Sequence, residues 1–413
     1  MKKRTILGAA CAATIAAVAI AAPAYAGGNH DGGNHGGWHH DVPEAPTLSL
    51  DPVATLAEGL VSPLSLDVDR HGDSYLSQNF IGELTGVSDD GEVNSLATAS
   101  VPGQEIGAVS SRHGTVYFSQ NDQPTGVANL MSLEEGGTPE LLADLGAYEA
   151  EVNPDQVNTY GFTDLDPACA AQVDPTGPAG PPTYTGIVDS HPYASLALRK
   201  AIYVADAGGN DILRVDYDGE ISTAAVLPPG DPVIVTPELA AQFAFPDCVV
   251  GHGYAFEPVP TDVERGDDGW LYVSSLPGGP EDASLGLRGS VYKVNPDDGE
   301  VELVATGFGG ATGIAVDKDS GVVLVAELFG GPDGTGQISA VSSRSGEVFA
   351  AFPVSAPAAI ELRDGMVYAT TDAFVPDESG NPQPIGKLSL YQLSDDDHGG
   401  CWGDDGEHEE EDS

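Results

Sequence analysis

Polar side chains recur at one position of a repeated pattern in this 413-residue chain. In each copy a short apolar strand, usually with a central Tyr, is followed at once by amide, hydroxyl or carboxylate residues. Two residues near Asp206 in the third copy, His191 and Asn210, are added to this set. The candidate ligand-binding residues are Gln78, Asn79, Gln120, Asn121, His191, Asp206, Asn210, Ser275, Glu327 and Asp372. Oxygen atoms of these types hold hard cations such as Ca²⁺, and they also bind sugars and other polar metabolites. We therefore predict a ligand site where these residues meet.

The same residues have a structural alternative. Asn and Asp side chains often bond to the backbone of nearby turns, so the set could cap strand ends instead. His191 precedes Pro192, which favours extended backbone at this residue. A purely structural role is therefore the alternative to ligand binding for His191. The many Asp-Gly turns lack the ligand alternation and the distal Glu of an EF-hand, so we interpret them as hairpin turns.

The strands that would position these residues repeat every 40–50 residues or so, which is typical of β-propeller blades. The marker strands are Ser74–Leu76, Val116–Phe118, Ile202–Val204, Leu271–Val273, Val323–Val325 and Val367–Ala369. We predict an all-β, six-bladed β-propeller with blades near 54–98, 101–150, 190–229, 259–308, 309–355 and 356–394.

Two Pro-rich stretches, 150–188 and 230–256, interrupt the repeat, and we predict insertions on one face. A degenerate seventh blade between Tyr117 and Tyr203 is the alternative. The segment 53–59 matches the outer strand of other copies, so we expect it to complete the last blade. That pairing would close the ring and satisfy backbone groups on an otherwise open edge.

The chain ends differ in composition from the predicted propeller at 47–394. Residues 1–26 have a Lys/Arg start, an Ala-rich apolar stretch and an Ala-Tyr-Ala cleavage site, which predicts a signal peptide and export from the cell. Residues 27–46 form a Gly/His-rich linker and residues 395–413 an acidic tail, both expected to be disordered. Weak binding of divalent metal is the alternative for these two ends.

Three cysteines remain after signal cleavage: Cys169, Cys248 and Cys401. Outside the cell a pair is expected, and Cys169 and Cys248 lie in the two Pro-rich stretches that flank one repeat. We predict that these two form a disulfide. Cys401 is left over, either free or paired between chains.

The formal charge of −49 arises from 64 acidic and 15 basic residues. Phosphate binding needs clustered Lys and Arg, so this composition argues against nucleic acid and anionic membranes as partners. After signal cleavage, we predict no membrane association. The remaining partners are an unknown small molecule or protein, and we expect a monomer.

The repeats resemble NHL-type propeller repeats and, more specifically, the ScyD/ScyE family of secreted bacterial propellers. The resemblance rests on SHPYASLAL at 190–198, YVADAGGNDILRVDYDG at 203–219 and AFEPVPTDVERGDDGWLYVSSLPGGP at 255–280. Two further segments, YLSQNFIGELTGVSDDG at 75–91 and VATGFGGATGIAVDKDSGVVLVAELFGG at 304–331, add to it. The resemblance implies secretion and six blades, and it implies no established reaction.

No nucleophile–base pair, zinc motif or cofactor loop is visible in the sequence. We therefore predict a non-enzymatic propeller without a cofactor, which binds a ligand or partner at the face of its channel. The alternative is a Ca²⁺-dependent extracellular hydrolase or lactonase. In that alternative Glu327, Asp206, Asn121 and Asp372 would serve as metal ligands or general base.

Overall fold

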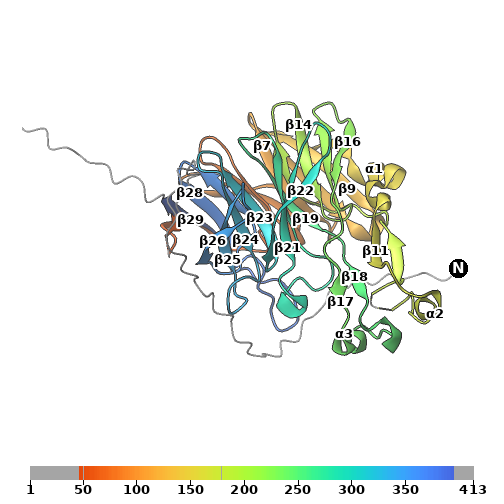
Figure 1. Cartoon of the computed structure of the whole chain (residues 1–413). Helices are drawn as coiled ribbons and strands as arrows, with labels where there is room; N and C mark the ends of the chain where they lie inside the picture. Colours follow the sequence, from red (N-terminus) through yellow and green to blue (C-terminus); the bar gives the residue numbers. More distant parts are fainter. Residues whose placement is uncertain (1–45, 50, 178, 395–413) are drawn as a thin grey trace, which may run out of the picture.

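The computed structural model describes residues 46–49, 51–177 and 179–394 (Figure 1). Within these residues antiparallel strands form seven sheets, six of four strands and one of five. Helices are few and short: α1 (Leu145–Val152), α2 (Pro167–Ala170) and α3 (Pro237–Gln242). The protein is thus all-β, with the many four-stranded antiparallel sheets of a propeller.

Six sheets follow the sequence repeat, and each is a meander of consecutive strands. The first two are β3 (Leu66–Val68), β4 (Ser74–Gln78), β5 (Glu83–Val87), β6 (Val93–Thr98), and β7 (Glu105–Arg112), β8 (Thr115–Asp122), β9 (Val127–Glu134), β10 (Glu140–Asp144). The next two are β13 (Pro192–Ala197), β14 (Ala201–Asp206), β15 (Asp211–Asp216), β16 (Ile221–Val226), and β19 (Pro260–Arg265), β20 (Leu271–Ser275), β21 (Gly289–Val294), β22 (Val301–Phe308). The last two are β23 (Ala311–Asp317), β24 (Val322–Glu327), β25 (Gln337–Ser342), β26 (Val348–Pro353), and β27 (Ile360–Arg363), β28 (Met366–Thr371), β29 (Gly386–Ser394).

The central strands are apolar because both faces of a sheet are covered by neighbouring sheets. In β14, Ile202 and Val204 pack against the sheet of β7–β10, in a cluster that includes Leu130. On the opposite face of the same sheet, Ala205 and Ile212 pack against Val263 and Val273 of the next sheet. A strand buried on both faces is expected to be continuously apolar, as these marker strands are.

The first strands of the six sheets contact one another in a cycle. β3 contacts β7, β7 contacts β13, β13 contacts β19, β19 contacts β23, β23 contacts β27, and β27 contacts β3. All six first strands therefore face a common centre, and their starting ends lie on the same side of the molecule.

The N-terminal segment joins the last sheet, as the sequence predicted. β2 (Ala54–Leu60) pairs antiparallel with β29, so that Ala57 lies opposite Leu388 and Leu60 opposite Gly386. The two-residue strand β1 (Thr47–Leu48) also pairs with β29, at its far end. Leu60 and Leu388 are buried in the cluster that contains Leu66 of the first sheet.

The two Pro-rich stretches form the seventh sheet together. Its strand order is β12 (Thr183–Thr185), β11 (Thr159–Phe162), β18 (Gly253–Ala255) and β17 (Val233–Ile234). Figure 1 shows this sheet with α2 and α3 at one end of the molecule. It lies outside the cycle of first strands, because β7 contacts β13 directly.

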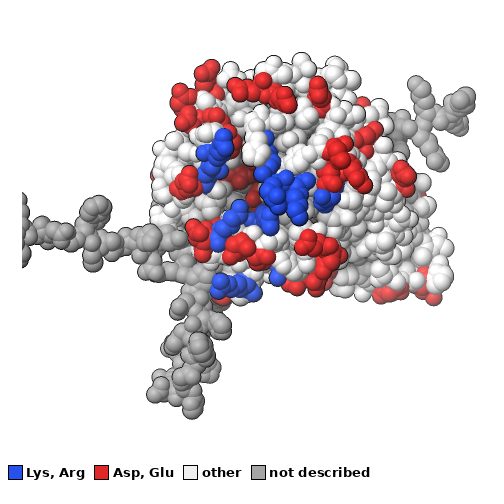
Figure 2. Space-filling view, turned by 90° about the horizontal axis from the view of Figure 1, so that it is seen from above, with Lys and Arg blue, Asp and Glu red and all other residues white. Residues whose placement is uncertain are grey.

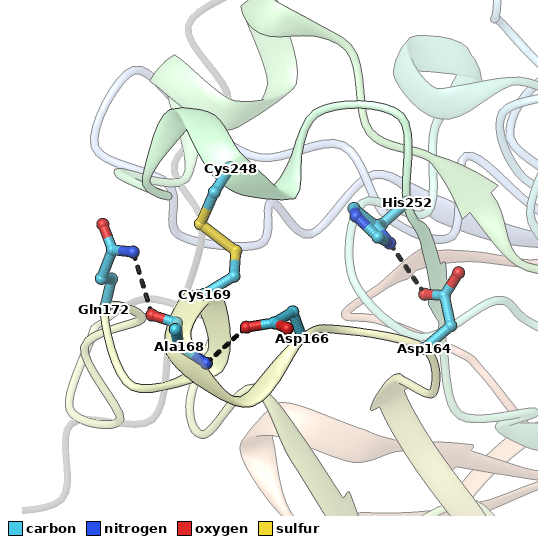
Figure 3. Close-up of a disulfide and its surroundings, with 7 residues drawn as sticks. All are labelled: Asp164, Asp166, Ala168, Cys169, Gln172, Cys248 and His252. Atoms are coloured by element: carbon cyan, nitrogen blue, oxygen red, sulfur yellow. Dashed lines mark hydrogen bonds and ion pairs between the residues drawn. A yellow bond between two sulfur atoms is a disulfide. The ribbon is translucent and has the colours of Figure 1, made fainter.

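A disulfide joins the two stretches (Figure 3). Cys169 of α2 is bonded to Cys248 of the 3₁₀ helix Asp247–Val249, which confirms the predicted pairing. Beside it, His252 Nδ1 lies 3.1 Å from Asp164 Oδ1. Phe162, Val249 and Tyr254 form the apolar core around the disulfide.

Several sequence predictions lie outside the described residues. They concern the signal peptide at 1–26, nearly all of the Gly/His-rich linker, Cys401 and the acidic tail at 395–413. Among the helices that are described, we find none with the length and apolar character needed to cross a bilayer.

Candidate functional site at the start of the first strands

The predicted ligand residues lie at one side of the molecule. Most of them lie at the end of the second strand of a sheet, next to the start of the first strand. Asp206, for example, lies opposite Pro192 at the start of β13. Seven of these ten side chains are buried and three are half-buried.

Glu327 and Asp372 illustrate this local bonding. Glu327 Oε2 accepts a hydrogen bond from the Gly309 backbone at 2.7 Å. Its Oε1 accepts bonds from Gln337 at 2.8 Å and from Ser339 at 2.5 Å. Asp372 accepts a bond from Ser355 at 2.5 Å and pairs with Lys387 at 2.9 Å.

Three further candidate residues, Gln78, Asn79 and Ser275, also form local hydrogen bonds, either to the loop before a first strand or to a residue close by in the sequence. Gln78 accepts a bond from the Val61 backbone at 2.8 Å. Asn79 accepts one from Ser77 at 2.5 Å, and Ser275 donates to the Pro258 carbonyl at 3.0 Å. These contacts correspond to the capping alternative, and a ligand-binding role for these residues stays a prediction.

Asn121 and Gln120 differ from the others. Asn121 Nδ2 donates to the Pro192 carbonyl at 3.1 Å, while its Oδ1 is buried without a partner. Gln120 is half-buried in β8. These two residues retain polar atoms that a ligand could use.

The lactonase-type cation site does not fit this arrangement. Glu327, Asp206 and Asp372 already use their carboxylate oxygens in local bonds. The described part of the chain holds no group of three or more His, Cys, Asp or Glu side chains that could hold a metal ion. We therefore derive no chemistry through a shared cation here.

The structure does bring His191 and Asp206 together, while Asn210 of the adjoining turn donates to Asp155 Oδ2 at 2.8 Å. Asp206 Oδ1 accepts bonds from the backbone of His191 at 2.6 Å and of Gly208 and Gly209, both at 3.1 Å. Its Oδ2 accepts a bond from Ser190 at 2.5 Å. Asp206 thus fixes the Gly-Gly-Asn turn and the residues that lead into β13.

His191 forms the exposed part of this group. Its Nε2 lies 2.9 Å from Oε2 of Glu105, at the start of β7, and the two side chains are 25% and 24% exposed. Its Nδ1 lies 3.4 Å from Gln123. Burial lowers the pKa of His191, but the hydrogen bond and charge of Glu105, with Asp206 and Asp189, outweigh it and raise the pKa.

Half-buried aromatic side chains lie on the same side. Tyr193, two residues after His191, packs in a cluster with Leu64, Leu328, Phe329 and Phe374. These residues come from the third, first, fifth and sixth sheets, so the cluster spans the centre of the molecule. Burial and the nearby charges of Glu281, Asp262 and Glu105 raise the pKa of Tyr193, which keeps its hydroxyl protonated.

A group of buried carboxyls that the sequence reasoning missed lies behind Asp206. Glu149 of α1, Asp155 and Asp211 are at most 3% exposed, and each has a carboxylate oxygen without a partner. A Cβ at Gly209 would lie 3.3–3.5 Å from atoms of Asp211, Asp206 and Glu149, so three carboxyls converge there. Burial, with the charges of Asp206 and Asp155, raises the pKa of Glu149 to about 8.

Comparison with known proteins identifies the fold and no family. No family profile matches the chain, and no curated protein matches it. An aldose sugar dehydrogenase from Streptomyces coelicolor, solved with PQQ, is 14% identical, covers 85% of this chain and 99% of its own, and has a TM-score of 0.51. A gluconolactonase from Xanthomonas campestris is 12% identical over 86% and 95% of the two chains, with a TM-score of 0.48. A virginiamycin B lyase from Staphylococcus aureus is 14% identical over 85% and 100%, with a TM-score of 0.44.

These structural neighbours are propeller-type proteins, which supports a propeller fold. The aldose sugar dehydrogenase is an enzyme, and this contradicts our prediction that the protein is not one. The physical reason for the error is that propeller sites are assembled from side chains of different sheets, which leaves no contiguous motif to find. At this level of identity the likeness establishes the fold and no particular reaction.

Proposed function

We propose that the six consecutive sheets are the blades of a six-bladed β-propeller, closed by β2, in a secreted protein of ScyD/ScyE type. Residues 47–394 would form the propeller, with the seventh sheet as an insertion. The cycle of first-strand contacts and the pairing of β2 with β29 support this arrangement. The disulfide supports the extracellular location.

We further propose that the protein binds a small organic ligand at the side where the first strands begin. The observation that carries this proposal is the partly exposed His191–Glu105 pair beside the aromatic cluster of Tyr193, Phe329 and Phe374. Ligand sites commonly combine aromatic surface with a few polar groups that fix orientation. The ligand would place an apolar or aromatic part on this cluster and a hydrogen-bonding group on His191.

A proton-transfer enzyme at the same place is the second candidate function. Glu105 holds the His191 ring at 2.9 Å, which fixes its orientation and favours one tautomer or the charged form. A His held in this way can act as general base or acid, for example in ester or lactone hydrolysis. The nearby aromatic cluster would then bind the apolar part of the substrate.

The test uses the purified mature chain and a library of small aromatic and polar compounds that includes lactones and esters. Ligands are scored by thermal shift and calorimetry, and turnover is assayed in parallel. We expect a ligand whose affinity falls about tenfold or more in His191→Gln and stays unchanged in His71→Gln, an exposed control. If His191→Gln and Glu105→Gln both bound the ligand with the affinity of the unchanged protein, the proposed site would be wrong. Turnover lost in His191→Gln would favour the enzyme.

A further inference from the structure

The positive charges of this acidic protein are gathered on one face. Twelve of the 15 Lys and Arg residues lie within the described part of the chain. Seven of these twelve lie in or beside the first hairpins, the turns that join the first and second strands of the six sheets. We call these seven residues the basic patch: Arg70, Arg112, Arg199, Lys200, Arg265, Lys318 and Arg363.

Every one of the six sheets contributes at least one member of the basic patch. Arg112, Arg265 and Arg363 are the last residues of β7, β19 and β27, and the others lie in the turns that follow β3, β13 and β23. Because the first strands contact one another in a cycle, their ends converge. Figure 2 shows Lys and Arg side chains in the middle of this face, with Asp and Glu mostly further out.

No member of the basic patch forms an ion pair with an Asp or Glu that the structure describes. Within the described residues Lys and Arg form three ion pairs, by Arg214, Lys293 and Lys387, and all three are outside the patch. Acidic residues in the same hairpins are engaged in their own turns. Asp69 accepts bonds from the backbone of His71 and Asp73, for example, and Asp317 accepts one from Asp319.

Burial reduces the negative charge of the carboxyls on the first strands at neutral pH. Burial, with the charge of Asp262, raises the pKa of Glu264 to about 8. Burial and the charges of Glu264 and Asp67 also raise the pKa of Glu361 well above its usual range. Burial also raises the pKa of Asp262 to about 7 and that of Asp67 to about 6. The four carboxyls therefore carry less negative charge than exposed ones would, and the basic patch keeps an attraction for anions.

The chain leaves the described structure on this same face. β29 runs alongside β28, with Gln392 opposite Met366, and Met366 in turn lies opposite Arg363. The Leu393 backbone donates to the Gly365 carbonyl at 2.9 Å. Residue 395 therefore begins one hairpin away from Arg363, at the edge of the basic patch.

The segment that follows has the complementary charge. Residues 395–413 contain ten Asp and Glu residues and no Lys or Arg. Nineteen residues can span roughly 60 Å when extended, which is enough to cross the face. A tethered segment acts at an effective concentration on the order of millimolar, whereas a free polyanion must approach a chain of net charge −49.

We propose that the acidic segment 395–413 docks on the basic patch of its own chain. The segment covers the hairpin side of the first strands and leaves the opposite side, with His191, as the open approach. Docking is electrostatic and therefore weakens with salt.

Zero-length carbodiimide cross-linking of the full mature chain, read by mass spectrometry, tests the proposal. The reagent joins a carboxyl to a lysine amine, and the described residues offer Lys200 and Lys318 in the patch and Lys293 and Lys387 outside it. We expect residues 395–413 to be joined to Lys200 and Lys318 at least fivefold more often than to the other two, after correction for each lysine's acetylation rate. The preference should disappear in 0.5 M NaCl.

Two variants sharpen the result. Arg112→Gln with Arg363→Gln keeps both reactive lysines and should cut these cross-links several-fold, whereas Arg344→Gln, a control in the β25–β26 hairpin, should not. Should the double variant not fold, replacement of Glu407, Glu409, Glu410 and Glu411 by Gln makes the same test from the other side. Equal joining to all four lysines, no joining at all, or joining that salt leaves unchanged would overturn the proposal.

Discussion

Nε2 of His191 lies 2.9 Å from Oε2 of Glu105. The two residues are 86 positions apart in the sequence, and they stand at the beginnings of two neighbouring first strands, β13 and β7. The pair therefore joins two sheets at the side where we place the ligand site. It also makes the charge of His191 depend on Glu105.

Replacement of Glu105 by Gln should lower the pKa of His191. The Glu105 hydrogen bond and charge help to raise this pKa against the effect of burial, so their removal leaves burial as the larger influence. The shift is measured by NMR titration of the imidazole. Gln123→Ala, on the other side of the ring, is the control and should leave the pKa nearly unchanged.

The same change has a pH-dependent effect on stability. A His whose pKa is raised by folding stabilises the protein fully below its unfolded pKa, and this contribution disappears as pH rises through the folded pKa. Glu105→Gln should therefore cost about 1 kcal/mol near pH 6 and less near pH 9. An equal loss of stability at both values would contradict the proposed coupling.

Glu149 should destabilise the protein at alkaline pH. Burial and neighbouring carboxyls raise its pKa from 4.5 to about 8, so its contribution to stability is present below pH 4.5 and is lost as pH rises through 8. Glu149→Gln should raise the free energy of unfolding at pH 9 by roughly 2–4 kcal/mol and change little at pH 4.5. Denaturant melts at both values measure this, with exposed Glu151→Gln as control.

The Cys169–Cys248 disulfide should stabilise the seventh sheet rather than the other six. It closes a loop of 79 residues, which corresponds to roughly 4 kcal/mol in the chain-entropy model. The strands it supports are only two to four residues long. Cys169→Ser with Cys248→Ser should speed hydrogen exchange in 159–185 and 233–255 strongly, and that in β14 little. Equal acceleration in both regions would show that the seventh sheet is not a separate unit.

The sequence could predict the six repeated sheets because their information is local. Ile202 and Val204 are apolar since both faces of β14 are covered, and the Asp218-Gly219 turn lies next to the strand it ends. Even the distant pairing of β2 could be predicted, because its pattern matched the outer strands of other copies. The seventh sheet could not be predicted, because its strands come from distant segments that no repeat marks. Gly161, for example, pairs with Ala255 across more than ninety residues.

The site was predicted only in part for a related reason. Asp206, Asn210 and His191 lie in one repeat, so their proximity follows from the chain itself. Glu105, Glu149 and Asp155 reach them from other segments, and no local pattern marks residues that meet only through the tertiary fold. The Gly208-Gly209 pair is the one available signal. A Cβ at Gly208 would lie 2.8 Å from the His191 backbone nitrogen, and a Cβ at Gly209 would lie 3.3–3.5 Å from the carboxyls.

The pairing of β2 with β29 should control the stability of the whole propeller. Leu60 is 3% exposed and packs with Leu388 of the last sheet and Leu66 of the first. Leu60→Ala should therefore cost about 2–4 kcal/mol, the usual range for a buried Leu. If β2 closes the ring, the loss reaches both adjoining sheets, so hydrogen exchange should accelerate in β3 and in β28 alike.

Exposed Thr55, in the same strand, provides the matched control. Thr55→Ala keeps the backbone pairing with Ser389 and removes no buried side chain, so its free energy of unfolding should change by less than about 0.5 kcal/mol. An open arrangement of sheets predicts a different result for Leu60→Ala, because damage would stay in the last sheet. Faster exchange in β28 with unchanged exchange in β3 would therefore contradict closure by the N-terminal strand.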